Sequence, residues 1–214
     1  MRLLEAAASI FSESGFDVST REVAGRAGVT QALLYKHFKS KSSLVAAVLD
    51  HVFADRFRGD WAVLADASDN RSFEDRLVDG YARFARTSDG QRMRLFVRAG
   101  LDGWSQALRR GGALTTLIFE PVIAELRKCV GLSDLAARPM LRGERELAMM
   151  LHGAVVFLSI RKHVYGMAMA DDQSDVVELY VRTFFNGALV TLKQVHAAEA
   201  ARGLTVTQLR PKRL

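Results

Sequence analysis

Side chains that can bind base edges and phosphates follow one another closely near the start of the chain. Gln31 carries a side-chain amide that can pair with the edge of an adenine, and Tyr35 carries a hydroxyl that can meet a phosphate oxygen. Lys41 is a cation just before an expected helix, where it can also reach a phosphate. The stretch from Val23 to Leu49 contains no acidic residue, which favours a polyanionic partner; its lysines and arginines are Arg26, Lys36, Lys39 and Lys41.

Two short helices are expected ahead of these side chains. Residues 1–14 repeat apolar residues at the spacing of an amphipathic helix, which Gly15 ends because glycine tolerates a left-handed backbone. Ser19 and Glu22 have the spacing of a capping box, in which the serine side chain caps the Glu22 amide and the glutamate reaches back to the Ser19 amide. The sequence therefore predicts a first helix, a loop and a short second helix.

A tight turn connects this second helix to a third helix, expected over residues 31–37. Gly28 lets the backbone bend sharply, and Thr30 is placed to cap the third helix. Two helices joined in this way form a helix-turn-helix, whose last helix fits the major groove of B-DNA and meets base edges with its first turn. The side chains predicted on the outer face of the third helix are Gln31, Ala32, Leu33, Tyr35 and Lys36.

The segment from Glu22 to Leu44 resembles the DNA-binding signature of the TetR (tetracycline-repressor-like) family of transcriptional regulators. Its Ala-Gly-Val turn, its Leu-Tyr-x-His-Phe block and its Ser-Lys pair ahead of a leucine match that signature in order and spacing. The loop between Gly15 and Val23 is a residue shorter than usual in the family, and Leu33 makes the base-reading face more apolar. The resemblance implies phosphate contacts from Ser19 or Thr20, Thr30, Tyr35, His37 and Lys41, and base contacts from Gln31, Ala32 and Leu33.

Each of these side chains also has a purely structural interpretation. Tyr35 could be a half-buried core tyrosine, and His37 could cap the end of the third helix and interact with its dipole. Lys36 and Lys39 could be solvated cations without a partner. Gln31 is expected to be exposed under either interpretation.

The whole chain has helical periodicity and no sustained alternation of period two, which predicts an all-α protein. We expect a helix-turn-helix DNA-binding domain over residues 1–48, a larger helical ligand-sensing and dimerisation domain over 49–202, and a basic tail over 203–214. The net charge is +6, and four basic residues lie at Arg202 and beyond without any acid. The later helices are expected from a cap at Ser40 or Ser42 towards Arg58, and then near 72–86, 91–108, 113–130, 144–169 and 174–201.

Two of the later helices carry apolar stripes suited to pairing with a second subunit. The resemblance implies a homodimer held by four helices, two from each chain, that binds a palindromic site on double-stranded DNA. The alternative is that the stripes are buried within their own subunit. The predicted interface residues are Leu147, Leu151, Ala154 and Leu158 in one helix, and Val177, Val181, Phe184, Ala188, Thr191 and Val195 in the last.

The middle helices contain large apolar residues that could enclose a small apolar or aromatic ligand or could simply form the core. We expect such a ligand to release a repressor by changing the separation of its two reading helices from about 34 Å. The helix that begins near Ser42 would be the lever. A ligand-independent DNA-binding or partner-binding regulator on the same fold is the alternative. The candidate pocket residues are Trp61, Phe84, Phe96, Trp104, Phe119, Met150, His152 and Phe157.

Enzymatic, metal-binding and membrane functions find little support in the sequence. The single cysteine, Cys129, allows no internal disulfide and no cysteine-rich metal site. His152, His163, Asp171 and Asp172 lack the spacing of a metal motif, and no nucleophile signature or phosphate-binding glycine loop accompanies them. No signal peptide and no long uncharged apolar segment is visible. We therefore expect a cytoplasmic protein that is not an enzyme and needs no cofactor or metal.

Overall fold

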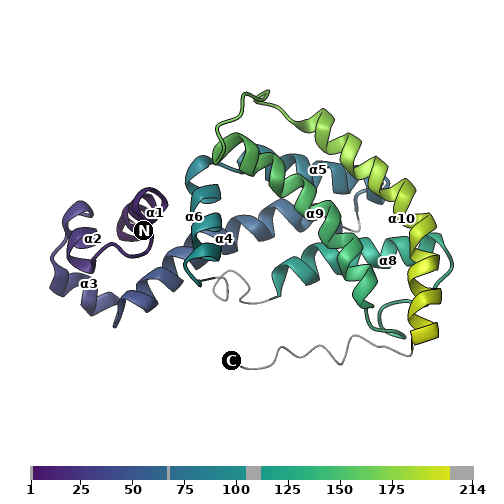
Figure 1. The fold of residues 1–214 in the computed structure, drawn as a ribbon, viewed down its shortest axis with the longest axis horizontal. Coiled ribbons are helices and arrows are strands. Elements are labelled where there is room, and N and C mark those ends of the chain that lie inside the picture. The colour runs from purple at the N-terminus through teal and green to yellow at the C-terminus, as the bar shows by residue number, and fades with distance from the viewer. Residues whose placement is uncertain (1, 67, 105–111, 203–214) are drawn as a thin grey trace. The chain divides into compact units, whose positions relative to one another are not determined.

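The computed structural model of this chain describes residues 2–66, 68–104 and 112–202, apart from the side chains of residues 2, 54–58, 60 and 200–202. The described residues form helices and loops and contain no β-strand, so the all-α prediction is confirmed (Figure 1). In chain order the helices are α1 (Arg2–Ser14), α2 (Thr20–Arg26), α3 (Gln31–His37), α4 (Lys41–Ala65), α5 (Phe73–Thr87), α6 (Gly90–Leu101), the π-helical turn η1 (Thr115–Phe119), α8 (Glu120–Cys129), α9 (Arg142–His163) and α10 (Ser174–Arg202).

These helices belong to two compact units. The first unit holds the described residues within Met1–Gly59, Arg86–Gly112 and Ser159–Met169. The second holds those within Asp60–Ala85, Ala113–Leu158 and Ala170–Leu214. Helix α6 lies in the first unit, although it falls outside the domain predicted over residues 1–48.

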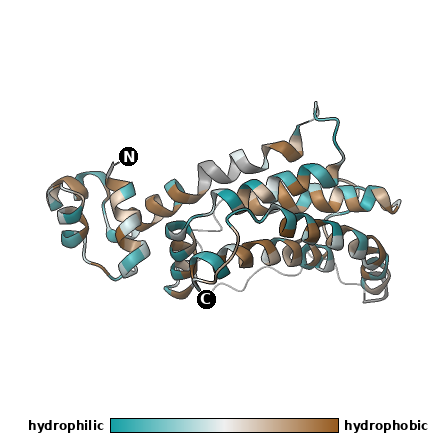
Figure 2. Cartoon of the chain, turned by 90° about the horizontal axis from the view of Figure 1, so that it is seen from above, coloured by the Kyte–Doolittle hydropathy of each residue, from teal (hydrophilic) through white to brown (hydrophobic). Residues whose placement is uncertain are grey.

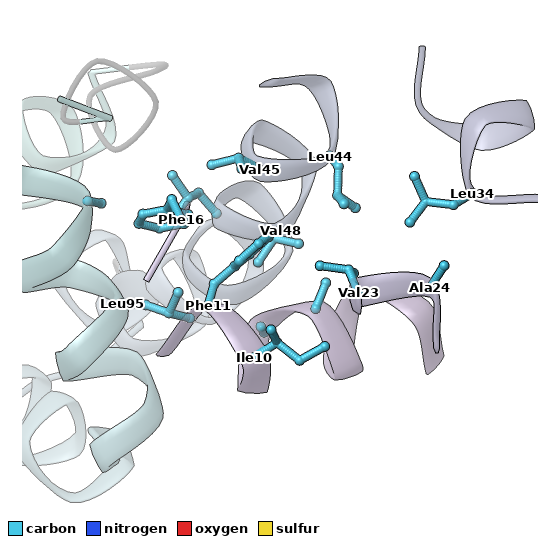
Figure 3. Close-up of a cluster of buried hydrophobic side chains, with 14 residues drawn as sticks. Ile10, Phe11, Phe16, Val23, Ala24, Leu34, Leu44, Val45, Val48 and Leu95 are labelled. Carbon is cyan, nitrogen blue, oxygen red and sulfur yellow. The ribbon is translucent and has the colours of Figure 1, made fainter. Parts of the chain in front are cut away.

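The core of the first unit positions α3. Apolar side chains of α1, α2, α3 and the start of α4 pack into one cluster, and Leu95 of α6 joins it (Figure 3). Leu34 is fully buried in this cluster, which forces the remaining side chains of the first turns of α3 outwards. The labelled members of the cluster are Ile10, Phe11, Phe16, Val23, Ala24, Leu34, Leu44, Val45, Val48 and Leu95.

Short-range caps set the ends of these helices at the predicted Ser19 and Thr30, although among the described residues no bond runs from the Glu22 side chain back to the Ser19 amide. The Ser19 hydroxyl accepts a hydrogen bond from the Glu22 amide at 3.2 Å, and the Thr30 hydroxyl accepts one from the Leu33 amide at 3.1 Å. At the start of α4 it is Ser40 that caps, because its hydroxyl accepts from the Ser43 amide at 3.1 Å. Gly28 has a φ of 68°, which a residue with a side chain rarely adopts and which makes the turn into α3 possible.

Helix α6 holds the end of α1 in place. The Arg98 guanidinium donates a hydrogen bond to the carbonyl oxygen of Glu13 at 2.9 Å, and so satisfies one of the free carbonyls at the end of α1. Leu95 and Ala99 on the same helix are fully buried in the shared core. The helix-turn-helix therefore rests on a helix that follows it by some 50 residues in the chain.

Two predicted helices are shorter than expected. The helix predicted over 91–108 ends at Leu101, and residues 105–111 lie outside the described part of the chain. The helix predicted over 144–169 ends at His163. In both places a glycine with positive φ follows the helix end, Gly103 at 78° and Gly166 at 65°, and such a backbone does not continue a right-handed helix.

The π-helical turn η1 directly precedes α8. Pro121 follows it, and proline has no amide hydrogen to donate to the carbonyl four residues earlier. The Glu120 amide donates to the Thr115 carbonyl, five residues back, which widens the turn ahead of the proline. The sequence predicted one regular helix over 113–130.

The second unit contains a buried cluster of charged and polar residues, in which Arg127 and Glu144 are fully buried. The Arg127 guanidinium donates to both carboxylate oxygens of Glu144, at 2.7 and 2.6 Å. It also donates to the carbonyls of Ser133, Asp134, Arg138 and Pro139, while His196 Nε2 lies 2.8 Å from Glu144 Oε1. This cluster connects α8, α9 and α10 and fixes the loop between α8 and α9.

Hydrophobic and hydrophilic residues alternate around the helices (Figure 2). Helix α5 shows the pattern clearly, with Leu77, Tyr81 and Phe84 buried along one side and charged residues along the other. Among the described helices, none combines the length and the apolar character that a membrane span requires.

Candidate nucleic-acid interface

The outer face of α3 exposes the side chains that the sequence predicted for it. Gln31, Ala32 and Lys36 are exposed, and Leu33 and Tyr35 keep 40% and 44% of their surface. Tyr35 is about half exposed, and its contact with DNA stays a prediction. Leu34 on the opposite side of α3 stays buried. The exposed face can therefore enter a major groove without disturbing the core.

A hydrogen-bonded network joins α2 to this face of α3. The Gln31 side-chain amide donates to the Thr20 hydroxyl at 3.2 Å, and the same hydroxyl lies 3.0 Å from the Tyr35 hydroxyl. Thr20 keeps only 8% of its surface, so its hydroxyl is turned towards α3 rather than towards solvent. The sequence interpretation placed Thr20 among the phosphate contacts and missed this network, because the residues lie 11 and 15 positions apart in the chain.

The remaining polar candidates surround this network. Ser19 and Thr30 are exposed, and the hydroxyl of each accepts a hydrogen bond from a backbone amide. Each hydroxyl therefore keeps its own hydrogen, which it can donate to a phosphate. His37 is exposed at the end of α3, and its ring centroid is 6.4 Å from that of Phe38. Lys41 begins α4 and is partly buried.

The charge on this surface is mostly uncompensated. Arg26 forms an exposed ion pair with Glu13 at 2.8 Å, and hydrogen bonding from Arg26 and then Ser9 lowers the pKa of Glu13. Within the part of the chain that the structure describes, no carboxylate pairs with Lys36, Lys39 or Lys41. The face that carries α3 is therefore suited to an anionic partner.

Comparison with known proteins agrees with this geometry. Residues 3–48 match the sequence model of the bacterial regulatory proteins of the tetR family. This N-terminal segment is therefore similar to the DNA-binding segment of the TetR family. The matched model describes regulatory proteins, which supports the prediction that the chain is not an enzyme.

The curated relatives include a repressor and an activator of transcription. The chain is 36% identical over 77 residues to the transcriptional repressor KstR2 of Rhodococcus jostii, which covers 36% of this chain and 38% of that protein. It is 35% identical over 121 residues to the transcriptional activator FasR of Mycolicibacterium smegmatis, which covers 56% of this chain and 44% of that protein. The chain thus spans less than half the length of these two relatives.

Solved structures share the fold over most of the chain. A transcriptional regulator from Pseudomonas aeruginosa superposes with a TM-score of 0.68 at 20% identity, covering 89% of this chain and 91% of that one. The fatty acid degradation regulator FadR from Bacillus halodurans superposes with a TM-score of 0.64 at 14% identity, covering 87% and 97%. At these identities the similarity establishes the TetR fold and nothing further.

The eight candidate pocket residues are divided between the two units. Trp61, Phe84 and Phe119 are buried in the second unit around His152, whose ring centroid is 6.0 Å from Phe84 and 6.1 Å from Phe119. In the first unit Phe96 packs on Phe53, and Trp104 packs on Phe16. Met150 and Phe157 are exposed on α9. The cluster around His152 thus gathers three of the other candidates, and helical spacing alone could not tell which unit a side chain enters.

Tyr81 belongs to this cluster and was missed. Its ring centroid is 4.6 Å from Trp61 and 6.0 Å from His152. Burial raises the pKa of Tyr81 and lowers the pKa of His152 to about 4, so both side chains are uncharged at neutral pH. The sequence did contain a signal for it, because the spacing of Leu77, Tyr81 and Phe84 places all three on one apolar stripe of α5.

The predicted dimer residues lie in two different environments. An apolar groove of about 470 Å³ runs between α9 and α10, and six of the predicted residues line it: Leu147, Leu151, Ala154, Phe184, Ala188 and Thr191. Val177 and Val181 are fully buried and Leu158 is 3% exposed, so these three belong to the core of their own subunit. Val195 lies over Gly143 in the same unit. These four contact other residues of their own chain, and the dimer contacts of the six groove residues stay a prediction.

Proposed function

We propose that this chain is a TetR-family transcriptional regulator that binds a specific DNA sequence. The observation that carries the proposal is the exposed face of α3, on which Gln31, Ala32 and Leu33 can meet base edges beside an uncompensated basic surface. Ser19, Thr30, Tyr35, His37 and Lys41 would then hold the phosphates on either side and set the register of α3 in the groove.

Selection from a pool of random duplexes at two salt concentrations tests this function. A specific palindromic site should be recovered, and its affinity should fall roughly 10³- to 10⁵-fold between 50 and 200 mM salt if six to ten phosphates are contacted. Retention of all sequences alike would contradict the proposal. Such a result would place binding on the basic surface alone.

We propose further that the protein acts as a homodimer through the groove between α9 and α10. Large apolar side chains remain exposed beside this groove, with Leu179 at 62% and Met150 at 59%. Exposed apolar surface of this kind marks an interaction site, and a second copy would cover it with the same residues.

The oligomeric state of two matched variants tests the dimer. Ala154→Arg places a charge in the groove and should yield monomers in analytical ultracentrifugation. Ala124→Arg adds the same side chain to the exposed face of α8 and should leave the dimer intact. A dimer that survives Ala154→Arg would require a different interface.

The best-supported regulatory scheme is repression that a small apolar or aromatic ligand relieves. The uncharged cluster of Trp61, Tyr81, Phe84, Phe119 and His152 suits such a ligand, and α4 extends from the first unit into the second. A ligand that favours another spacing of the reading helices would lower operator affinity. Calorimetric titration of the protein–operator complex tests the scheme, and unchanged operator affinity at saturating ligand would refute it.

The tight burial of this cluster favours a second candidate, a regulator on the same fold that responds to no ligand. Trp61 and Phe119 keep 1% and 0% of their surface, so a ligand must displace packed rings. The relatives include both a repressor and an activator, so a reporter gene placed behind the selected site is needed to measure the sign of regulation. A regulator of this kind works in the cytoplasm, where its operator is.

A further inference from the structure

The hydroxyl of Thr20 makes two hydrogen bonds whose directions can be worked out from chemistry. The Gln31 nitrogen Nε2 can only donate, so Thr20 Oγ1 is the acceptor in the 3.2 Å contact. Tyr35 lies 3.0 Å from the same oxygen, and either hydroxyl could donate in that contact. A phosphate only accepts, so a Tyr35 that binds phosphate must donate its own hydrogen outwards and accept from Thr20.

DNA binding would therefore align the three side chains into one directed chain. Hydrogen bonds would run from Gln31 to Thr20, from Thr20 to Tyr35 and from Tyr35 to phosphate. Hydrogen bonds aligned in this way polarise and strengthen one another. Thr20 is the middle residue of this chain of hydrogen bonds. Because it is only 8% exposed, water has little access to its hydroxyl and does not easily substitute for these bonds.

The same geometry limits what Gln31 can offer to a base. One of its two amide hydrogens is committed to Thr20, which leaves one N–H and one carbonyl oxygen. Adenine presents N7 as an acceptor and N6 as a donor in the major groove, and this pair needs one donor and one acceptor. Guanine presents two acceptors, N7 and O6, and would place its O6 against the Gln31 carbonyl.

We propose that Thr20 is a positioning residue that sets the base preference of Gln31 to adenine over guanine and couples this reading to the phosphate contact of Tyr35. The inference rests on the proposed DNA-binding function. It assigns Thr20 a role in specificity, which a residue that merely touches the backbone of DNA does not have.

The test repeats the selection from random duplexes with four proteins: the wild type, Gln31→Ala, Thr20→Val and Thr20→Ser. The base pair at which preference disappears in Gln31→Ala is the one that Gln31 reads. At this pair the wild type and Thr20→Ser should favour adenine. Thr20→Val keeps the shape of threonine but frees the second amide hydrogen, so its preference for adenine over guanine should fall about fivefold or more.

Several results would overturn the inference while leaving DNA binding in place. These are a Thr20→Val protein that keeps the wild-type preference, a wild type that favours guanine, and a selected site that Gln31→Ala leaves unchanged. Failure to recover any site with the wild type would instead overturn the proposed function, and the inference with it. Thr20→Ala, which also lacks the hydroxyl, replaces Thr20→Val if the valine variant melts at a lower temperature.

Affinity for the selected duplex supplies a second readout. Thr20→Val and Tyr35→Phe break the same chain of hydrogen bonds, so each should weaken binding about three- to tenfold and the double variant should lose less than the product. Strictly multiplicative losses would refute the coupling. Fluorescence anisotropy with a labelled duplex measures all four affinities.

Discussion

Replacing Arg127 by methionine should destabilise the protein far more than replacing any exposed arginine. Arg127 and Glu144 have side chains that are 1% and 0% exposed, and the guanidinium forms six hydrogen bonds, two to Glu144 and four to loop carbonyls. Its loss leaves a buried carboxylate whose remaining donors are the Leu141 amide and His196. Removing one partner of a buried pair costs about 3–5 kcal/mol.

The ionisation of Glu144 follows from the same contacts. Burial opposes its charged form, but the hydrogen bonds from Arg127, the Leu141 amide and His196 outweigh this effect and lower its pKa. A carboxyl whose folded pKa is depressed stabilises the fold above its unfolded pKa of 4.5 and loses this contribution as the pH falls through the folded value. In Arg127→Met this acid-sensitive contribution should shrink.

Thermal unfolding followed by circular dichroism measures the effect. For a chain of this size, a loss of about 3–5 kcal/mol lowers the melting temperature by roughly 6–20 °C. The matched control is Arg145→Met, an exposed arginine on α9 with one hydrogen bond to Thr115 Oγ1, which should cost about 0.5 kcal/mol or less.

A second variant separates the lost charge pairing from lost packing. Adding Glu144→Gln to Arg127→Met removes the uncompensated charge while an amide oxygen can still accept from Leu141, so part of the stability should return. The reasoning would be refuted if Arg127→Met and Arg145→Met had the same melting temperature. It would also be refuted if adding Glu144→Gln lowered the melting temperature of Arg127→Met further.

Two more predictions concern the second unit. Because the pKa of His152 falls from 6.5 to about 4 on burial, the fold should lose up to about 3 kcal/mol as the pH drops from 6.5 to 4. His152→Phe should remove this part of the pH dependence of urea unfolding, and an unchanged profile would contradict the burial argument. Gly143→Ala would place a Cβ 2.5 Å from Val195 Cγ1 and should cost about 1–3 kcal/mol. Gly153→Ala meets nothing within 4 Å and should instead stabilise α9 by about 0.5–1 kcal/mol; melting temperatures that rank the two in the opposite order would count against this packing.

The features that the sequence predicted well depend on neighbours a few positions away. The caps at Ser19 and Thr30 each join a hydroxyl to an amide three residues on, and the outward face of α3 follows from helical spacing around Leu34. The helix ends at Leu101 and His163 were also accessible in principle, because Gly103 and Gly166 follow them closely. Continuous apolar periodicity outweighed these glycines in the prediction.

Only the tertiary structure decided which helix faces meet. Thr20 reaches Gln31 and Tyr35 across the turn, and Arg98 reaches Glu13 over 85 positions. A stripe of apolar residues predicts that a helix face is buried, but it does not say whether the face packs in the first unit, the second unit or against another chain. The sequence by itself therefore determined the helices and the motif of α3. The partners of each side chain depend on packing between segments far apart in the chain, and local spacing carries no information about it.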